Sequence, residues 1–357
     1  MSEGDRAREP RPSRWRPGIL AALGAAVLFG LATPLAKRLL HSADPWLLAG
    51  LLYFGSGLGL VLYRYLVGAA QVRMARAEIL WFFGAIVAGG VVAPVLLMFG
   101  LSAMAASGAS LLLNAEGAFT ALLAWFVFKE NFDRRIALGV AFILAGALLL
   151  SWQGEARFAG VWPALAILGA CFAWAIDNNL TRKVSLTDAT WIASVKGLAA
   201  GAVNLVLAFF LGARLPSFPV IVGAMTVGLL AYGVSLALFV VALRHLGTAR
   251  TGAYFSVAPF FGALLALILG EAMTPQLLGA AALMAIGVWI HLAEEHAHQH
   301  THEKLTHAHE HVHDDSHHEH EHDPPVPPGT RHSHPHRHLP LTHGHAHFPD
   351  AHHRHRH

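Results

Sequence analysis

Charged residues and cysteine are both scarce in this chain. Only 13% of its 357 residues are charged, roughly half the share of an ordinary soluble chain. Between residues 17 and 290 the sequence has 15 basic and 9 acidic residues, too few to cover the surface of a soluble domain of that size. A single cysteine, Cys171, excludes an internal disulfide framework and a cysteine-rich zinc module. These shortages indicate a polytopic membrane protein.

The sequence also lacks the motifs of nucleotide and nucleic-acid binding. No Walker or dinucleotide pattern lies on a strand–helix unit, so we expect no ATPase domain. The formal net charge of +3 is not accompanied by a basic stripe or a nucleic-acid motif, so we expect no nucleic-acid partner. No catalytic constellation is present, and we expect that the protein is not an enzyme.

Long apolar stretches make up most of the chain, of which 55% is hydrophobic. A membrane-spanning helix needs roughly 20 mainly apolar residues. This length predicts ten spans, at residues 17–37, 46–67, 79–100, 107–128, 136–153, 159–180, 190–212, 218–243, 250–270 and 275–292. None of them has the alternation of a lipid-facing barrel strand. The predicted fold class is all-α and integral to the membrane.

Lysine and arginine are distributed unequally between the predicted connections. If the N-terminus lies in the cytoplasm, the cytoplasmic segments carry 15 of these residues and the opposite side carries four. Short cytoplasmic connections are enriched in positive charge. The first span has no cleavage pattern and is not expected to be a cleaved signal peptide. The sequence therefore predicts a multi-pass membrane protein with both termini in the cytoplasm.

Two parts of the chain resemble each other in sequence. Residues 108–130 and 249–271, at an offset of 141, both end in an aliphatic run closed by glutamate, at Glu130 and Glu271. A similar match links residues 30–38 with 174–182. Each half would contain five spans, and an odd number makes the second half enter the membrane from the opposite face. Inverted repeats of this kind are typical of secondary transporters, with the binding site near the midplane.

The ends of these segments resemble the EamA-type repeats of the drug/metabolite transporter superfamily. Each repeat in that family has a proline-containing stretch followed by an aliphatic run that ends in Gly-Glu or a similar pair. Residues 259–271 match this pattern, whereas Ala118 and Lys129 depart from it. The resemblance covers residues 17–292. It implies a ten-helix carrier of the inner (plasma) membrane, a class whose members commonly export amino acids or other small metabolites. The domains are then a basic N-terminus (1–16), a first repeat (17–153), a second repeat (154–292) and a tail (293–357).

Three ionisable residues inside predicted spans are the first candidates for a binding site. Glu116, Asp177 and Lys196 lie in spans four, six and seven, where an unpaired charge costs several kcal/mol. Glu116 could titrate a proton or bind a substrate ammonium group, and Lys196 could neutralise it or hold a substrate carboxylate. The alternative is a structural Glu116–Lys196 pair, or a Lys196 that reaches the interface. Further candidates for the substrate or coupling-ion site are Asn114, Trp174, Asn178, Tyr254 and Pro259.

Prolines inside three predicted spans are a second pointer. Pro34, Pro94 and Pro259 are expected to interrupt spans one, three and nine. Backbone carbonyls freed by such interruptions can line a cavity. The alternative is a kink that only shapes helix packing. Both readings stay open at this point.

The tail is rich in histidine, with 24 among residues 291–357. A segment of this composition cannot bury a core, and we expect it to be disordered without a ligand. Imidazole is a good ligand for Zn, Ni, Co and Cu ions, and affinity alone does not select one of them. The candidate metal ligands are His296, His298, His300, His302, His307, His309, His311, His313, His317, His318, His320 and His322.

Two transport functions fit these observations. The first is export of a small polar metabolite or amino acid, with the tail as a metal sensor or buffer; no cofactor is required. The second is export of a divalent cation such as Ni, Co or Zn that the tail gathers. The spans offer few metal ligands, which favours the metabolite. A metal sensor that does not transport, or a membrane enzyme, is the third class. Expected partners are lipid, a small-molecule substrate and divalent metal ions. The sequence leaves open whether the protein forms a homodimer.

Overall fold

The computed structural model describes most of the apolar part of the chain and four short segments of the tail. The described residues are 15–72, 74–127, 134–151, 158–184, 187–292, 297–301, 306–311, 332–337 and 342–346. Residues 1–294 and 295–357 form two compact units, and each is described by itself.

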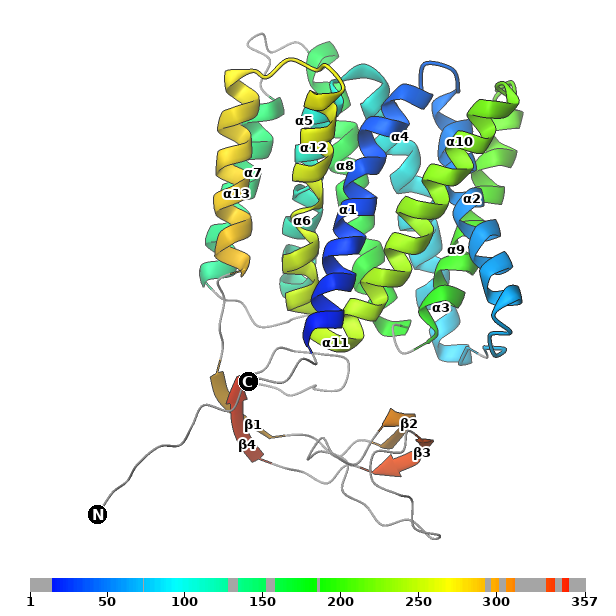
Figure 1. Cartoon of the computed structure of the whole chain (residues 1–357). Helices are drawn as coiled ribbons and strands as arrows, with labels where there is room; N and C mark the ends of the chain where they lie inside the picture. Colours follow the sequence, from blue (N-terminus) through cyan, green and yellow to red (C-terminus); the bar gives the residue numbers. More distant parts are fainter. Residues whose placement is uncertain are drawn as a thin grey trace. The chain divides into compact units, whose positions relative to one another are not determined.

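The first unit is a bundle of helices that run nearly parallel or antiparallel to one another (Figure 1). The helices of the first half are α1 (Trp15–Leu39), α2 (Pro45–Leu66), α3 (Arg76–Ala85), η1 (Ile86–Val92), α4 (Ala93–Ala103), α5 (Ala106–Leu112), α6 (Ala115–Phe126) and α7 (Arg134–Ser151). Those of the second half are α8 (Phe158–Thr181), η2 (Arg182–Val184), α9 (Ala189–Phe210), α10 (Phe218–Gly228), η3 (Leu229–Val234), α11 (Ser235–Phe255), α12 (Ala258–Ile268) and α13 (Pro275–Leu292).

Among the described residues, six helical stretches are long and apolar enough to cross a membrane. They are Pro17–Leu39, Pro45–Leu66, Arg76–Ser102, Val161–Thr181, Ala189–Phe210 and Phe218–Ala242. The all-α membrane class is therefore confirmed. The other predicted spans coincide with shorter helices, three of which are apolar over Ala137–Leu150, Ala258–Ile268 and Pro275–Ile290. The count of ten spans stays a prediction.

Several predicted spans are not regular α-helices. The span expected at 107–128 is broken into α5 and α6 at Leu113–Asn114, and two others contain the π-helices η1 and η3. The expected connection near residues 244–249 is wrong, because α11 runs on to Phe255. The chain leaves the helix after Phe255, and α12 starts at Ala258. Pro259 is the second residue of α12, where a missing backbone N–H costs no hydrogen bond of the helix.

The prolines therefore act differently from one another. Pro94 is the second residue of α4 and follows the π-helix η1, as a residue without a backbone N–H can at the first turn of a helix. Pro34, by contrast, lies inside α1, which continues to Leu39. The predicted interruption of the first span is wrong.

The repeat-related helices α2 and α9 pack directly against each other. A Cβ atom on Gly57 would overlap the backbone of Leu198, and one on Gly197 would overlap the backbone of Gly57. Close approach through small residues is usual between membrane helices. The two helices begin in the same way, with Asp44 and Asp188 as N-caps. Figure 1 draws the α1–α2 connection at the upper end of the bundle and the α8–α9 connection at the lower end.

The main hydrophobic core joins helices of both halves. Fully buried leucines of α2 and α4 (Leu48, Leu52 and Leu97) pack in one cluster with Ile167 of α8. The start of α1 and the end of α13 lie at the same, lower end of the bundle (Figure 1). An even number of crossings produces this arrangement.

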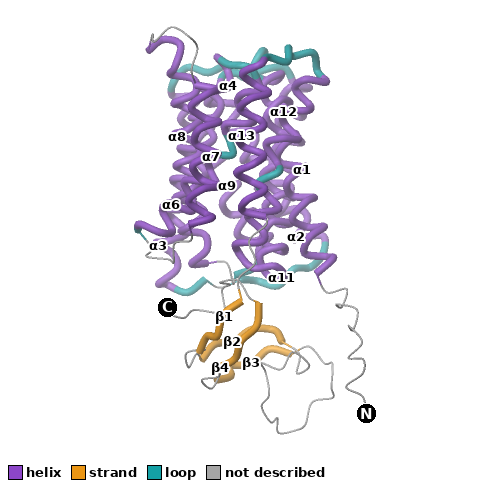
Figure 2. Tube along the Cα trace, turned by 90° about the vertical axis from the view of Figure 1, so that its left-hand side faces the viewer, coloured by secondary structure: helices purple, strands orange, loops and turns teal. Residues whose placement is uncertain are grey.

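The described part of the tail forms four short strands, drawn in orange in Figure 2. They are β1 (Ala297–Thr301), β2 (Thr306–His311), β3 (His332–Arg337) and β4 (Thr342–Ala346). β1 pairs with β4 and β2 pairs with β3, both antiparallel. At these segments the expectation of a disordered tail is wrong, because alternation of histidine with other residues has the period of a strand.

Candidate functional site

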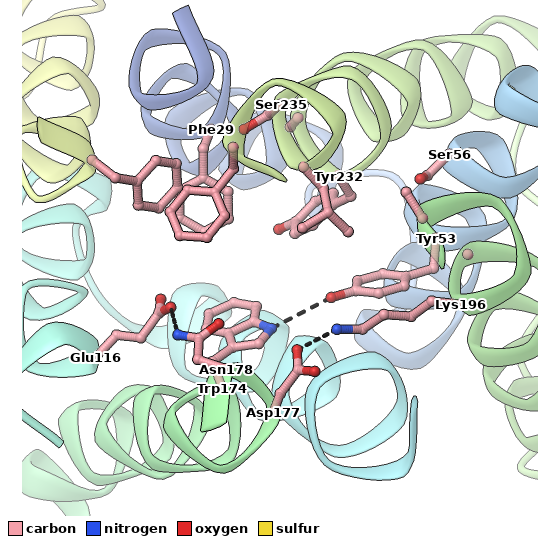
Figure 3. A pocket seen from close by; sticks show the side chains of 16 residues that line it. Phe29, Tyr53, Ser56, Glu116, Trp174, Asp177, Asn178, Lys196, Tyr232 and Ser235 are labelled. Carbon is pink, nitrogen blue, oxygen red and sulfur yellow. Dashed lines mark hydrogen bonds and ion pairs between the residues drawn. The ribbon is translucent and has the colours of Figure 1, made fainter. Parts of the chain in front are cut away.

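A cavity with a volume of about 80 Å³ lies inside the bundle. Its walls come from α1, α2 and α6 of the first half and from α8, α9, η3 and α11 of the second. The lining residues are Phe29, Tyr53, Ser56, Glu116, Trp174, Asp177, Asn178, Ala193, Lys196, Gly197, Ala231, Tyr232, Ser235, Leu236, Phe239 and Phe255. Five of the residues singled out in the sequence therefore meet here (Figure 3).

Glu116 lies at one end of the cavity, in the first turn of α6. Asn178 Nδ2 of α8 donates a hydrogen bond to Glu116 Oε1 over 2.8 Å, and the same nitrogen lies 3.4 Å from Thr120 Oγ1. Because α6 begins after the break at Leu113–Asn114, Glu116 is placed close to the start of a half-helix. The carboxylate is thus held by a neutral amide (Figure 3).

Asp177 and Lys196 form an ion pair at the other end of the cavity (Figure 3). Each side chain is only 6% exposed. Thr181 Oγ1 donates to the second carboxylate oxygen of Asp177 over 2.9 Å. The hypothesis that Lys196 pairs with Glu116 is wrong, because the lysine of α9 faces the aspartate of α8 and neutralises that charge instead.

Gly89 in the π-helix η1 makes room for this ion pair. A Cβ atom at Gly89 would overlap the Asp177 carboxylate. The carbonyl oxygen of Gly89 accepts hydrogen bonds from Tyr53 Oη at 2.7 Å and from Trp174 Nε1 at 3.0 Å. A π-helix often occurs at a functional site, and here it supplies an acceptor that fixes two rings of the wall.

Aromatic rings form the middle of the cavity wall. Phe29 meets Trp174 and Tyr232 edge to face, with ring centroids 6.0 Å and 5.9 Å apart. Tyr53 and Tyr232 lie 5.0 Å apart. Such rings present a negative face to cations. The cavity therefore places an aromatic surface between a carboxylate and an ion pair.

Three of the predicted site residues are not in this cavity. Asn114 is buried, and its Nδ2 donates to the Leu111 carbonyl oxygen over 3.2 Å. Tyr254 packs against a small cluster that includes Ala22 and Ala242. Pro259 is buried at the start of α12. Sequence reasoning missed Phe29, Tyr53, Ser56 and Ser235, which have no charge to distinguish them within an apolar span.

The predicted metal ligands of the tail are only partly described. His298, His300, His307, His309 and His311 lie on β1 and β2. His296, His302, His313, His317, His318, His320 and His322 lie outside the described residues. In the part of the chain that the structure describes, no three His, Cys, Asp or Glu side chains gather as a metal site.

The sequence has relatives among transporters. An uncharacterized transporter of Methanothermobacter thermautotrophicus is 28% identical over 271 residues, which cover 71% of this chain and 79% of the relative. A probable amino-acid metabolite efflux pump of Salmonella typhimurium is 28% identical over 300 residues, covering 78% and 95%. The uncharacterized inner membrane transporter YedA of Escherichia coli K12 is 27% identical over 154 residues, covering 42% and 49%.

The fold and the family agree with this relationship. A solved structure titled "Crystal structure of protein" matches with a TM-score of 0.60 at 18% identity, over 79% of this chain and 96% of that one. The model of the EamA-like transporter family matches twice, at residues 16–152 and 161–293. This confirms the resemblance that the repeat ends suggested. The chain belongs to the EamA-like transporter family.

Proposed function

We propose that this chain is a secondary transporter that exports small polar metabolites bearing an amine, amino acids among them, across the inner membrane. The observation that carries the proposal is the position of Glu116. Lys196 neutralises Asp177, so the cavity keeps one negative charge when Glu116 is ionised. A carboxylate beside aromatic faces is suited to an ammonium group.

Two further observations support an amino acid as substrate. Ser56 Oγ lines the cavity and has no hydrogen-bond partner among the described residues, so it can bind a polar group of a ligand. A relative is named a probable amino-acid metabolite efflux pump. The alternative, a divalent cation, needs several converging ligands. Around the cavity, the described carboxylates are Glu116 and an aspartate already paired with lysine.

Transport by the purified full chain in proteoliposomes tests this function. The probes are a set of radiolabelled amino acids, the corresponding amines, and Ni²⁺ and Zn²⁺ ions. We expect movement of an amine-bearing probe, and we expect Glu116→Gln to abolish it because only the titratable charge is lost. The matched control is Glu78→Gln, since Glu78 accepts from Ala75 N at the start of α3 and does not line the cavity. Movement of the metal ions alone, or an active Glu116→Gln variant, would contradict the proposal.

The proposed architecture is ten spans in two inverted repeats with both termini in the cytoplasm. The N-caps of α2 and α9 and the π-helices η1 and η3 occur at repeat-related positions, which supports the repeat. Reporter fusions at both termini test the orientation. A reporter that is active on the outer side of the membrane would contradict it.

We also propose that the tail binds divalent metal ions. The strand register supports this, because it sets histidine opposite histidine: His307, His309 and His311 are paired with His336, His334 and His332. In β1 and β4, His298 and His300 are paired with His345 and His343. In each of these strands the histidines alternate with other residues.

Calorimetric titration of the full chain with Ni²⁺ or Zn²⁺ tests the metal site. Protons compete with metal ions for the ring nitrogens of histidine. An unperturbed imidazole has a pKa of about 6.5, so metal binding should weaken between roughly pH 7 and pH 5. Replacing His332, His334 and His336 by asparagine should lower the number of bound ions. A full chain that binds none of Ni, Co, Zn or Cu near neutral pH would contradict the proposal.

A further inference from the structure

Glu271, the last residue of the motif that indicates the family, lies away from the cavity. It follows α12 in the connection to α13, after Gly270, which has a φ of +102°. A glycine adopts this left-handed conformation readily and ends the helix. The carboxylate of Glu271 accepts hydrogen bonds from Ala106 N at 2.7 Å and Ser107 N at 2.8 Å. Glu271 therefore binds the start of α5.

The start of α5 needs such a partner. All residues of this short helix are buried, and the first N–H groups of a helix have no partner within it. A negative charge at this end is also favoured by the helix dipole. α5 ends at the break just before Glu116. The carboxylate of Glu271, from the second repeat, therefore holds the half-helix of the first repeat that leads to Glu116.

Lys37 makes the complementary contact at the end of α4. Its Nζ donates to the carbonyl oxygens of Leu101 at 2.7 Å and Ser102 at 3.1 Å. The last carbonyls of a helix are free acceptors, and a positive charge there is favourable. The short connection from α4 to α5 is thus held on both sides by charges of α1 and of the α12–α13 connection. Lys37 and Glu271 are called the charge clamp below.

The charge clamp holds elements that reach the cavity from two sides. α4 continues from η1, whose Gly89 carbonyl binds Tyr53 and Trp174. α5 continues through the break into α6, which carries Glu116. A movement of the α4–α5 corner would therefore displace both the aromatic wall and the carboxylate. The clamp belongs to the end of the bundle where Figure 1 draws the α12–α13 connection, in yellow.

We propose that the charge clamp is the gate at this end of the bundle: while it is formed the cavity is closed to that side, and its release opens the cavity there. The inference rests on the proposed transport function, since a carrier must expose one site to each side in turn.

Thiol labelling tests the gate without any substrate. Cys171 is buried and is the one cysteine of the chain, so a Cys171→Ala background carries no other thiol. Ser56→Cys then places a reporter in the cavity wall, where the serine hydroxyl has no partner to lose. A membrane-impermeant thiol reagent is applied to vesicles of each orientation, and the labelling rate is measured.

We expect Glu271→Gln to raise the labelling rate at least tenfold from the side of the α12–α13 connection, and not from the other side. Lys37→Gln should act in the same direction, and it serves as the second variant if Glu271→Gln does not fold. Glu78→Gln, at the start of α3, should leave both rates unchanged.

Unchanged labelling in both Glu271→Gln and Lys37→Gln would overturn the gate, as would an equal rise from both sides. The labelling result is independent of transport. A protein that moves no amine-bearing probe would refute the proposed substrate and still report on the clamp. If transport depends on Glu116 but the labelling rate does not change when the charge clamp is altered, the proposed function stands and the gate is refuted.

Discussion

The buried ion pair is the feature at the residue scale that sets the charge of the cavity. Asp177 and Lys196 are each 6% exposed on their side chains. Removing one partner of such a pair leaves an uncompensated buried charge, which typically costs about 3–5 kcal/mol, whereas removing both can be nearly neutral. The pair therefore stabilises the contact between α8 and α9 and also sets the net charge of the candidate site.

A double-mutant cycle measures this coupling. Lys196→Met and Asp177→Asn should each lower the melting temperature of the detergent-purified protein strongly, because each leaves one buried charge alone. The double variant should be more stable than either single variant, because it leaves no buried charge alone. Additive losses in the double variant would show that the two side chains do not interact energetically.

Gly89 should also be sensitive to substitution, because it lies against the ion pair. Gly89→Ala places a methyl group against the Asp177 carboxylate, so either the pair or the π-helix must move, at a cost of roughly 1–3 kcal/mol. The matched control is Gly117→Ala in α6, where the new Cβ meets nothing within 4 Å and should stabilise the helix by about 0.5–1 kcal/mol. Thermal unfolding of both variants measures the difference. Equal changes in stability would contradict the explanation that the Asp177 carboxylate leaves no room for a Cβ atom at Gly89.

Charge in an apolar sequence was a sound guide to single residues but not to their partners. Glu116, Asp177 and Lys196 stand out because ionisable groups inside spans are rare, and all three line the cavity. Which carboxylate faces Lys196 depends on the rotation of α8 and α9 about their axes, which the spacing along one chain does not determine. Asn114 and Tyr254 were further candidates, and both contact other neighbours instead.

At the scale of elements, the length of an apolar run predicts where a helix lies better than how regular it is. The ends of α1, α2 and α9 agree with the predicted spans to within a few residues. The sequence gives no clear sign of the π-helices η1 and η3 or of the break between α5 and α6. Gly, Ala and Leu, which are common there, occur in α-helices, in π-helices and at breaks between helices. Pro94 and Pro259 marked two of the irregular places; Pro34 marked none.

The start of α5 should show a pH dependence that comes from Glu271. Burial raises the pKa of this carboxyl, but hydrogen bonds from Ser107 and Ala106 and the charge of Lys37 outweigh it, so its pKa lies below the ordinary value of 4.5. A depressed folded-state pKa stabilises the protein above that ordinary value, and the effect is lost as the pH falls through the folded-state pKa.

Glu271→Gln tests this at two pH values. At neutral pH the variant should be less stable than the parent by about 1–2 kcal/mol, because a neutral amide caps buried N–H groups less well than a carboxylate. The gap should shrink as the pH is lowered below 4.5. The gap between Gly117→Ala and the parent should not change with pH, and a constant gap for Glu271→Gln as well would rule out the charge as the cause.

At the scale of the whole molecule, the family and the helical fold indicate a membrane transporter. The histidine-rich tail is an addition that the family model does not cover. The family model ends at residue 293, and the second unit begins at residue 295. Composition predicted the separation of the tail, since a segment rich in histidine cannot join an apolar core. It did not predict the strand pairs, because pairing between residues 306–311 and 332–337 depends on contacts distant in sequence.

Deletion of residues 296–357 separates the two transport functions. The bundle should insert and melt as in the full chain, because the two units are compact by themselves. If the protein exports an amine-bearing metabolite, the deletion should leave its transport in proteoliposomes unchanged, and cellular resistance to Ni, Co, Zn and Cu should change little or fall equally for all four. If it exports a metal, resistance to one particular ion should fall, because the tail would no longer gather that ion for the cavity. Growth of cells expressing each form over a series of metal concentrations measures the difference, and selective sensitivity to one ion would contradict the metabolite as substrate.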